Sequence, residues 1–275
     1  MRAATNDLTL VAGAHLIRRR ASIAAAAAAL SLLALAIALP ASAQTVIAIT
    51  HVTVIDGRNP VPLVDQTVIL RGVRISAAGP SASTRTPRGA RLVDGRGKYL
   101  VPGFWDMHVH TVVPAGGDVL PLYIANGVTG VRDMAGDWGE LRAWRAEIAN
   151  GGLVGPRIVA SGPYLDANDQ PIAHLRARTP AEARVAVDSL VTLGVDFVKL
   201  HTGLSRETYL AALRAARDRG LPATGHVPRT VGAAEASDSG LRSIEHLLTI
   251  PTPCTVAESL ALQPRFPVQG ALGLC

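Results

Sequence analysis

Lysine and cysteine are the two rarest residue types in this sequence of 275 residues. Of the 27 basic residues only Lys98 and Lys199 are lysines. A lysine amine can lose its proton and react, whereas a guanidinium cannot, so a lysine kept here either marks a reactive position or survives by chance. The two cysteines, Cys254 and Cys275, lie near the C-terminus. Two cysteines are too few for a disulfide scaffold, which excludes that class of small secreted protein.

A basic run interleaved with aromatic residues is also missing. The whole chain carries a net charge of +6, and the first 43 residues account for +3 of it. The remaining +3 favours solubility and does not indicate a nucleic acid as a partner. We expect a small molecule or a dipeptide as the partner instead, and self-association into a homo-oligomer stays open.

Residues 1–43 are predicted to be a signal peptide. Arginines at 18–20 precede an apolar run from Ala21 to Leu39, and Pro40-Ala41-Ser42-Ala43 is typical of cleavage before Gln44. The run is long enough for an uncleaved membrane anchor, which is the alternative. No cysteine follows the run directly, which argues against a lipoprotein anchor. We therefore expect an exported protein, periplasmic or secreted, that contacts the membrane only through this segment if it stays uncleaved.

Residues 44–101 are predicted to form a small β-rich domain. Short runs rich in β-branched residues alternate with Gly and Pro, which is typical of short strands joined by turns. The stretch Ser81–Arg88 has the Ser, Thr and Pro content of a loop. The expected strands cover residues 46–49, 52–55, 67–70, 73–75 and 91–93.

After Gly103 the pattern changes to alternating strands and helices, which predicts an α/β domain over residues 102–275. Such repeats indicate a parallel sheet, either doubly wound or closed into a (β/α)8 barrel. No G-x-G-x-x-G motif opens a helix after the first strand, which disfavours a dinucleotide-binding fold. Strands are expected at 104–110, 130–133, 157–161, 196–201, 222–226 and 242–246. Helices are expected at 139–150, 180–193, 206–219, starting after the N-cap candidate Ser205, and 231–239.

Several polar residues stand at the ends of these predicted strands. His108 and His110 are one residue apart, so on a strand they project from the same face, as two ligands of one metal ion must. Alone, such a pair is more often structural. However, Lys199, His226 and His246 end three further strands, and the C-terminal strand ends of a barrel meet on one face. This distribution favours a metal site.

The motifs around these residues resemble the amidohydrolase superfamily of metal-dependent hydrolases, in particular its imidazolonepropionase-like and prolidase-like members. The resemblance covers most of the chain after the signal peptide, up to about Leu248. It implies a distorted (β/α)8 barrel of the TIM type with a small β-sandwich. The motifs that carry it are Val101–His110, Thr129–Met134, Gly155–Ile158, Asp196–Lys199, Gly225–Pro228 and Ser243–Leu247.

The resemblance also implies a binuclear site with divalent ions, usually zinc. His108 and His110 would hold the first ion, His226 and His246 the second, and a carboxylated Lys199 would bridge them. Such ions activate a water molecule and polarise a carbonyl, so that an amide, peptide, lactam or ester bond is hydrolysed.

Four further residues have less certain roles. His201 is expected to contact substrate or to orient the bridge, or else only to pack at the barrel mouth, and Arg229 is a candidate for a substrate carboxylate. Asp106 either holds a ligating histidine or closes a turn. Arg132 and Asp133 are expected to form a structural pair, with a substrate contact as the alternative.

The chain departs from the superfamily at its C-terminus. The last strand of the superfamily pattern carries an aspartate that serves as general base and acid, and after Leu247 the only carboxylate here is Glu258. The catalytic residue is therefore unknown, and we expect a C-terminally truncated, incomplete barrel of about six strands. The alternatives to a C–N hydrolase are a non-catalytic exported metal- or ligand-binding protein and an inactive truncation product.

Overall fold

The computed structural model describes residues 45–112 and 116–247. The predicted signal peptide, both cysteines and Glu258 lie outside these ranges. Among the described residues, no helix is both long enough and apolar enough to cross a membrane. The chain divides into two compact units, one that ends at Pro102 and one that starts at Gly103.

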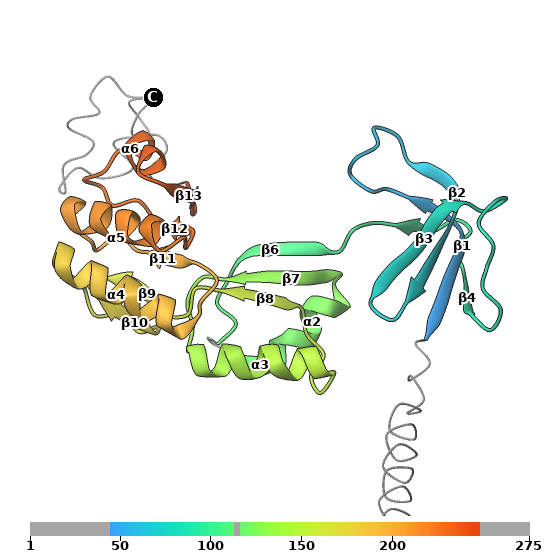
Figure 1. Ribbon diagram of the computed structural model, residues 1–275, viewed down its shortest axis with the longest axis horizontal. Coiled ribbons are helices and arrows are strands. Elements are labelled where there is room, and N and C mark those ends of the chain that lie inside the picture. The colour runs from blue at the N-terminus through green and yellow to red at the C-terminus, as the bar shows by residue number, and fades with distance from the viewer. Residues whose placement is uncertain (1–44, 113–115, 248–275) are drawn as a thin grey trace, which may run out of the picture. The chain divides into compact units, whose positions relative to one another are not determined.

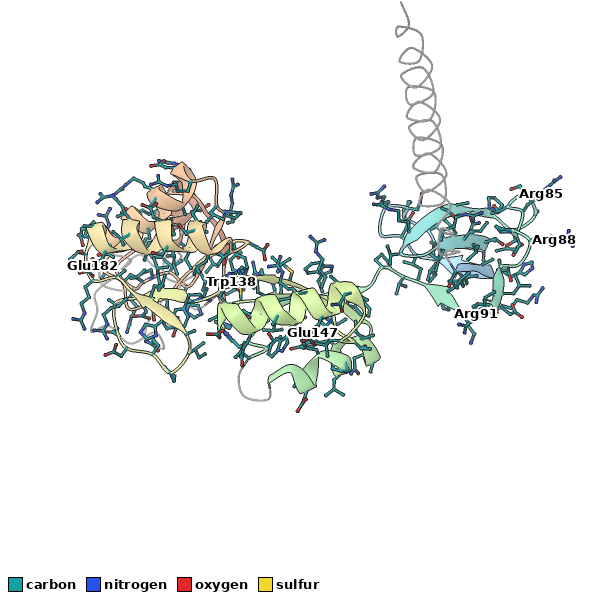
Figure 2. The ribbon with its side chains drawn as sticks, turned by 60° about the horizontal axis from the view of Figure 1, so that its bottom comes forward. Arg85, Arg88, Arg91, Trp138, Glu147 and Glu182 are labelled. Carbon is teal, nitrogen blue, oxygen red and sulfur yellow. The ribbon has the colours of Figure 1, made fainter. Side chains whose placement is uncertain are left out.

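The first unit is a five-stranded β-sheet (Figure 1) with the strand order β3-β2-β1-β4, in which β5 also pairs with β1. The two strands expected at 46–55 are one strand, because the backbone continues through an irregularity at His51, whose φ is +56°. Arg85, Arg88 and Arg91 project outward from this unit (Figure 2). The strands are β1 (Val46–Val54), β2 (Leu63–Arg71), β3 (Arg74–Pro80), β4 (Arg91–Asp94) and β5 (Tyr99–Leu100).

The second unit contains two parallel sheets, with the orders β6-β7-β8 and β10-β9-β11-β12-β13. The predicted α/β class with parallel strands is therefore confirmed, and each of the six strands expected after Gly103 is present. Two short strands, β9 and β10, were not expected. The strands are β6 (Phe104–Val109), β7 (Val128–Asp133), β8 (Arg157–Ala160), β9 (Tyr164–Asp166), β10 (His174–Arg176), β11 (Val198–Leu200), β12 (Ala223–Gly225) and β13 (Leu241–Ile244).

Helices connect these strands, and their ends follow from the local sequence. Asp137, Thr179 and Ser205 each accept a hydrogen bond from a backbone N–H of the first helical turn, so the predicted N-cap at Ser205 is confirmed. The described helices are η1 (Gly116–Val119), α2 (Leu120–Ala125), α3 (Trp138–Asn150), α4 (Pro180–Leu193), α5 (Arg206–Asp218) and α6 (Ala233–Asp238).

The core of this unit lies between the sheets and their helices, with α4 and α5 side by side (Figure 1). Fully buried apolar side chains such as Leu190, Leu200 and Leu213 come from α4, β11 and α5. The two sheets meet at Asp196, whose backbone N–H donates to the Ala160 carbonyl over 3.0 Å while its carboxylate accepts from the Ala160 N–H over 2.8 Å. This junction brings the C-terminal ends of strands from both sheets together.

Candidate metal and hydrolase site

The two histidines at the end of β6, His108 within it and His110 just after it, are each held through Nδ1. His108 Nδ1 lies 2.8 Å from Glu245 Oε2, and His110 Nδ1 lies 3.2 Å from the Ala135 carbonyl oxygen. A carboxylate and a carbonyl only accept hydrogen bonds, so Nδ1 carries the proton in both rings. In the neutral imidazole the lone pair is then on Nε2, which is the state needed for metal ligation.

Asp133 fixes the chain on both sides of His110. Its buried carboxylate accepts from the Thr111 N–H over 2.7 Å, from the Thr111 hydroxyl over 2.5 Å and from the Ala135 N–H over 3.2 Å. Thr111 follows His110, and Ala135 supplies the carbonyl that holds the ring. The expected pairing of Arg132 with Asp133 is therefore wrong. The two side chains point to opposite faces of β7, as neighbours on a strand do.

Lys199 lies in the middle of β11, where all three residues are buried. Its side chain is only 2% exposed, and Nζ has no hydrogen-bond partner among the described residues. Burial lowers the pKa of Lys199 to about 8, although the nearby Glu245 carboxylate acts in the opposite direction. A neutral, nucleophilic amine is therefore accessible close to physiological pH.

His226 follows β12 at a point where the backbones approach closely. A Cβ atom on the preceding residue, Gly225, would lie 2.1 Å from the carbonyl oxygen of Leu200, so only glycine fits there. Neither ring nitrogen of His226 has a hydrogen-bond partner within the described ranges. Burial, together with the neighbouring positive charge of Lys199, lowers the pKa of His226 to about 3. The ring is therefore neutral and its nitrogens are available to a ligand.

His246 lies just beyond β13, where the strand geometry ends. His246 and Leu247 have φ values of +62° and +58°, in the left-handed region that L-residues rarely adopt. On a regular strand Glu245 and His246 would face opposite sides. Here the Glu245 carboxylate reaches His108 and the His246 ring lies 4.4 Å from the His108 ring, measured between centroids. Both side chains therefore face the same site.

A cavity of about 80 Å³ joins all five predicted ligands. The His226 ring lies 5.0 Å from that of His246 and 6.5 Å from that of His108, and the His108 and His110 rings are 5.3 Å apart. This volume suits an ion or a few water molecules. The cavity is lined by His108, His110, Met134, Tyr164, Ile172, Lys199, His201, His226 and His246.

Glu245 was missed as a functional candidate from the sequence. Its carboxylate is 7% exposed and accepts from Arg132, from Ser243 and from His108. Burial raises the pKa of Glu245, but the hydrogen bonds from Ser243 and His108 and the charge of Arg132 outweigh it and leave the pKa below its usual value. Burial lowers the pKa of His108, against the effect of Glu245. The pair is therefore a carboxylate beside a neutral imidazole.

Asp106, the candidate for holding a ligating histidine or closing a turn, does neither. Its carboxylate accepts from the backbone N–H of His108 over 3.1 Å within β6, where the register with β7 shifts between Asp106 and Val109. The ring of His201, in contrast, is held by a buried carboxylate, that of Asp166 on β9. The short strand β9 gave no sequence signal for this contact.

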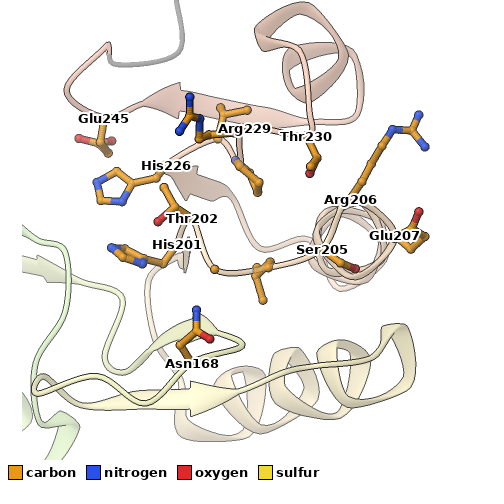
Figure 3. A pocket seen from close by; sticks show the side chains of 14 residues that line it. Asn168, His201, Thr202, Ser205, Arg206, Glu207, His226, Arg229, Thr230 and Glu245 are labelled. Atoms are coloured by element: carbon orange, nitrogen blue, oxygen red, sulfur yellow. The ribbon is translucent and has the colours of Figure 1, made fainter. Parts of the chain in front are cut away.

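A second cavity, of about 950 Å³, opens beside the first and shares His201 and His226 with it. Figure 3 shows His201, His226 and Glu245 at one end of this cavity and Arg206 and Glu207 at the other. Arg229 also lines it, so the two residues expected near the substrate lie on a common cavity wall. Arg206 is engaged by Glu235, whereas Arg229 has no ion-pair partner among the described residues.

Comparison with known proteins found chains that are similar in sequence and in structure. The chain is 30% identical over 169 residues to the imidazolonepropionase of Caulobacter vibrioides, an alignment that covers 60% of this chain and 36% of that protein. A solved amidohydrolase structure superposes with a TM-score of 0.66 at 19% identity, covering 84% of this chain and 73% of the other.

The chain is similar to proteins of the amidohydrolase superfamily. A further solved structure, an Xaa-Pro dipeptidase with methionine bound in its active site, superposes with a TM-score of 0.63 at 20% identity and covers 78% of this chain and 65% of the other. No family model matches the chain. The chain spans about a third of the length of the curated relatives that it matches.

Members of this superfamily generally use divalent metal ions, and the donor chemistry here fits such an ion. Lys199 Nζ and both nitrogens of His226 are buried without a partner among residues 45–112 and 116–247, and the Nδ1 contacts of His108 and His110 leave the lone pair of each ring on Nε2. Within the described ranges, however, no group of three or more His, Cys, Asp or Glu side chains is already arranged to hold a metal ion. The donors are gathered around one cavity but do not form a complete coordination shell.

Proposed function

We propose that this chain is the metal-binding part of an exported amidohydrolase that hydrolyses carbon–nitrogen bonds. The observation that carries the proposal is the 80 Å³ cavity, whose wall combines all five predicted ligands from four different strands. An amide, a cyclic amide or a dipeptide of the Xaa-Pro type is the proposed substrate class. The export proposal rests on the signal-peptide pattern of residues 1–43.

The proposed cofactor is a pair of zinc ions in an incomplete barrel of the TIM type. His108 and His110 would hold one ion, His226 and His246 the other, and a carboxylated Lys199 would bridge them. When bound, such ions lower the pKa of a water molecule and polarise a carbonyl oxygen. The burial of Lys199 and its unpartnered amine support the carboxylation, because the amine must be neutral to add carbon dioxide.

The remaining residues of the two cavities would bind and orient the substrate. His201, fixed by Asp166, and Arg229 are proposed to contact the substrate in the 950 Å³ cavity, where Arg229 has no other ion-pair partner among the described residues. A guanidinium binds a carboxylate through two parallel hydrogen bonds, which suits the free carboxylate of a dipeptide. Apolar side chains such as Leu204 and Val227 would exclude water on the same wall.

A non-catalytic metal- or ligand-binding protein is the second candidate. The observation that favours it is that the described residues lining the small cavity include no Asp or Glu that could act as a general base. Such a protein would bind metal or a small molecule in the same cavities without turnover.

Hydrolysis by the zinc-loaded chain without residues 1–43 tests the proposal. We expect release of amino acids from Xaa-Pro and other dipeptides, or ring opening of a cyclic amide, with loss of activity after chelation. His110→Asn should abolish this activity. His174→Asn should not, because His174 lies outside the small cavity and bonds the Ile172 carbonyl. Bound zinc without hydrolysis would favour the non-catalytic protein, and hydrolysis that survives both chelation and His110→Asn would contradict a metal-dependent mechanism.

A further inference from the structure

Glu245 is buried and lies at the centre of a hydrogen-bond network that joins β6, β7 and the end of β13. Its Oε1 accepts from Arg132 Nη2 over 2.7 Å and from Ser243 Oγ over 2.8 Å, while Oε2 accepts from His108 Nδ1 over 2.8 Å. One carboxylate oxygen is thus used by the supporting residues and the other by the histidine. The carboxylate is held rigidly from one side and contacts the His108 ring from the other.

Arg132 connects this network to the backbone of Met107, the residue before His108. Its Nε donates to the Met107 carbonyl over 2.7 Å and its Nη1 donates to Ser243 Oγ over 2.9 Å. The Arg132 side chain is 13% exposed; its bond to Ser243 is partly buried, whereas its bond to the Met107 carbonyl lies at an exposed position. β6 and β13 belong to different sheets. Arg132, on β7, therefore ties the residue before His108 to the residues around Glu245.

We propose that Glu245, held by Arg132 and Ser243, is a positioning residue that fixes the ring orientation and the tautomer of His108 for metal binding. The proposal rests on the metal-binding function proposed above and extends it to residues that are not ligands. A carboxylate that accepts a hydrogen bond from Nδ1 leaves the lone pair on Nε2. It also makes Nε2 more basic and therefore a stronger metal ligand. His110 has a neutral carbonyl in the same role, so the two histidines of the pair are supported differently.

Asp166 offers a matched control. It is also a buried carboxylate that contacts the Nδ1 of a histidine lining the same small cavity, but that histidine, His201, is not among the proposed metal ligands. A general effect of losing a buried carboxylate near the cavity would appear in both variants. A specific effect on His108 appears only when Glu245 is changed.

The test compares the wild-type chain with Glu245→Gln and Asp166→Asn. Zinc affinity is measured by competition with a chromophoric chelator, and the visible absorption spectrum of the cobalt(II)-substituted protein reports ligand geometry. We expect Glu245→Gln to weaken zinc binding about 10- to 100-fold and to alter the cobalt spectrum. Asp166→Asn should leave both readouts close to those of the wild-type chain.

Arg132→Lys is the second variant, in case Glu245→Gln does not fold. Lysine keeps the positive charge but cannot bond Met107, Ser243 and Glu245 together. We expect the same direction of change with a smaller amplitude. Wild-type zinc affinity and an unchanged cobalt spectrum in the folded variants would overturn the positioning role alone. A wild-type chain that binds neither metal would overturn the proposed function, and with it the positioning role.

Discussion

Lys199 lies on β11 and His226 directly follows the neighbouring parallel strand β12, and three of their nitrogen atoms are buried in the same cavity wall without a hydrogen-bond partner among the described residues. Buried polar groups are normally paired, because an unpaired one loses its hydration without compensation. These unpaired nitrogens therefore lower the free energy of unfolding of the ligand-free protein. A ligand that bonds to them would raise it again, so stability should increase on binding.

Replacing the buried lysine by an apolar residue should stabilise the metal-free protein. The pKa of Lys199 is lowered from 10.5 to about 8, which corresponds to a cost on the order of 3 kcal/mol for the charged amine at neutral pH. We expect Lys199→Met to raise the free energy of unfolding by up to about that amount at pH 7. The folded state binds fewer protons than the unfolded state between pH 8 and 10.5, so the gain should shrink over that range.

Urea unfolding of the chelator-treated protein measures this effect, and the only other lysine provides the control. Lys98 is exposed, so Lys98→Met should change the free energy of unfolding by no more than about 0.5 kcal/mol. A Lys199→Met variant that is less stable than the wild-type chain at pH 7 would contradict the unpaired, buried amine.

His226 should contribute to a loss of stability of the metal-free protein as the pH is lowered. Its folded pKa is about 3, whereas the ordinary pKa of a histidine is 6.5, so between these values the unfolded state binds the additional proton. The free energy of unfolding therefore decreases as the pH falls from 6.5 toward 3. His226→Asn should show a shallower decrease between pH 7 and pH 5 in urea titrations. An equal slope in both proteins would show that His226 is not buried in its neutral form.

A methyl group at Gly225 should disrupt the approach of β12 to β11. The added Cβ would lie 2.1 Å from the Leu200 carbonyl oxygen, so the backbone must move, at a cost of about 3 kcal/mol or more. Gly194→Ala is the control, because Gly194 also has a positive φ but no atom of the described residues lies within 4 Å of the added methyl. That variant should lose only about 1 kcal/mol. Equal losses in thermal unfolding would argue against the close contact.

Substitution of Arg229 should affect substrate binding more than turnover. If Arg229 binds a substrate carboxylate, Arg229→Gln should raise KM about tenfold or more and leave kcat nearly unchanged, because a uniform binding interaction is lost. Arg206→Gln should have a smaller effect, since Arg206 is engaged by Glu235. Steady-state kinetics on a dipeptide and on the same dipeptide with an amidated C-terminus test whether Arg229 binds the substrate carboxylate, because the amidated substrate lacks it. The same loss of kcat with both substrates would contradict the contact.

Site residues could be predicted from the sequence where the end of a predicted strand carries a single functional residue. Lys199 and His226 follow short apolar segments, so their position at the cavity could be predicted from the alternation of strands and helices. The role of Glu245 could not. Strand periodicity places it on the face opposite to His246, and only the left-handed backbone at His246 turns both toward His108.

Other features escaped prediction because their signals are short or nonlocal. β9 and β10 have three residues each, too few for a periodic pattern, although β9 supplies the carboxylate that holds His201. Arg132 and Asp133 looked like a pair because they are adjacent. Their true partners, Glu245 and Thr111, are far from them in sequence and come together only when β6, β7 and β13 are in place.

Zinc stoichiometry decides whether Lys199 and the four histidines form a binuclear site. The chain without residues 1–43 is reconstituted with zinc in bicarbonate buffer, dialysed and analysed for metal, beside Lys199→Arg treated in the same way. We predict about two zinc ions per wild-type chain and a clear loss in Lys199→Arg, because arginine cannot be carboxylated and cannot bridge two ions. Equal zinc content in the two proteins would contradict the assignment of Lys199, and absence of zinc from both would contradict the metal site itself.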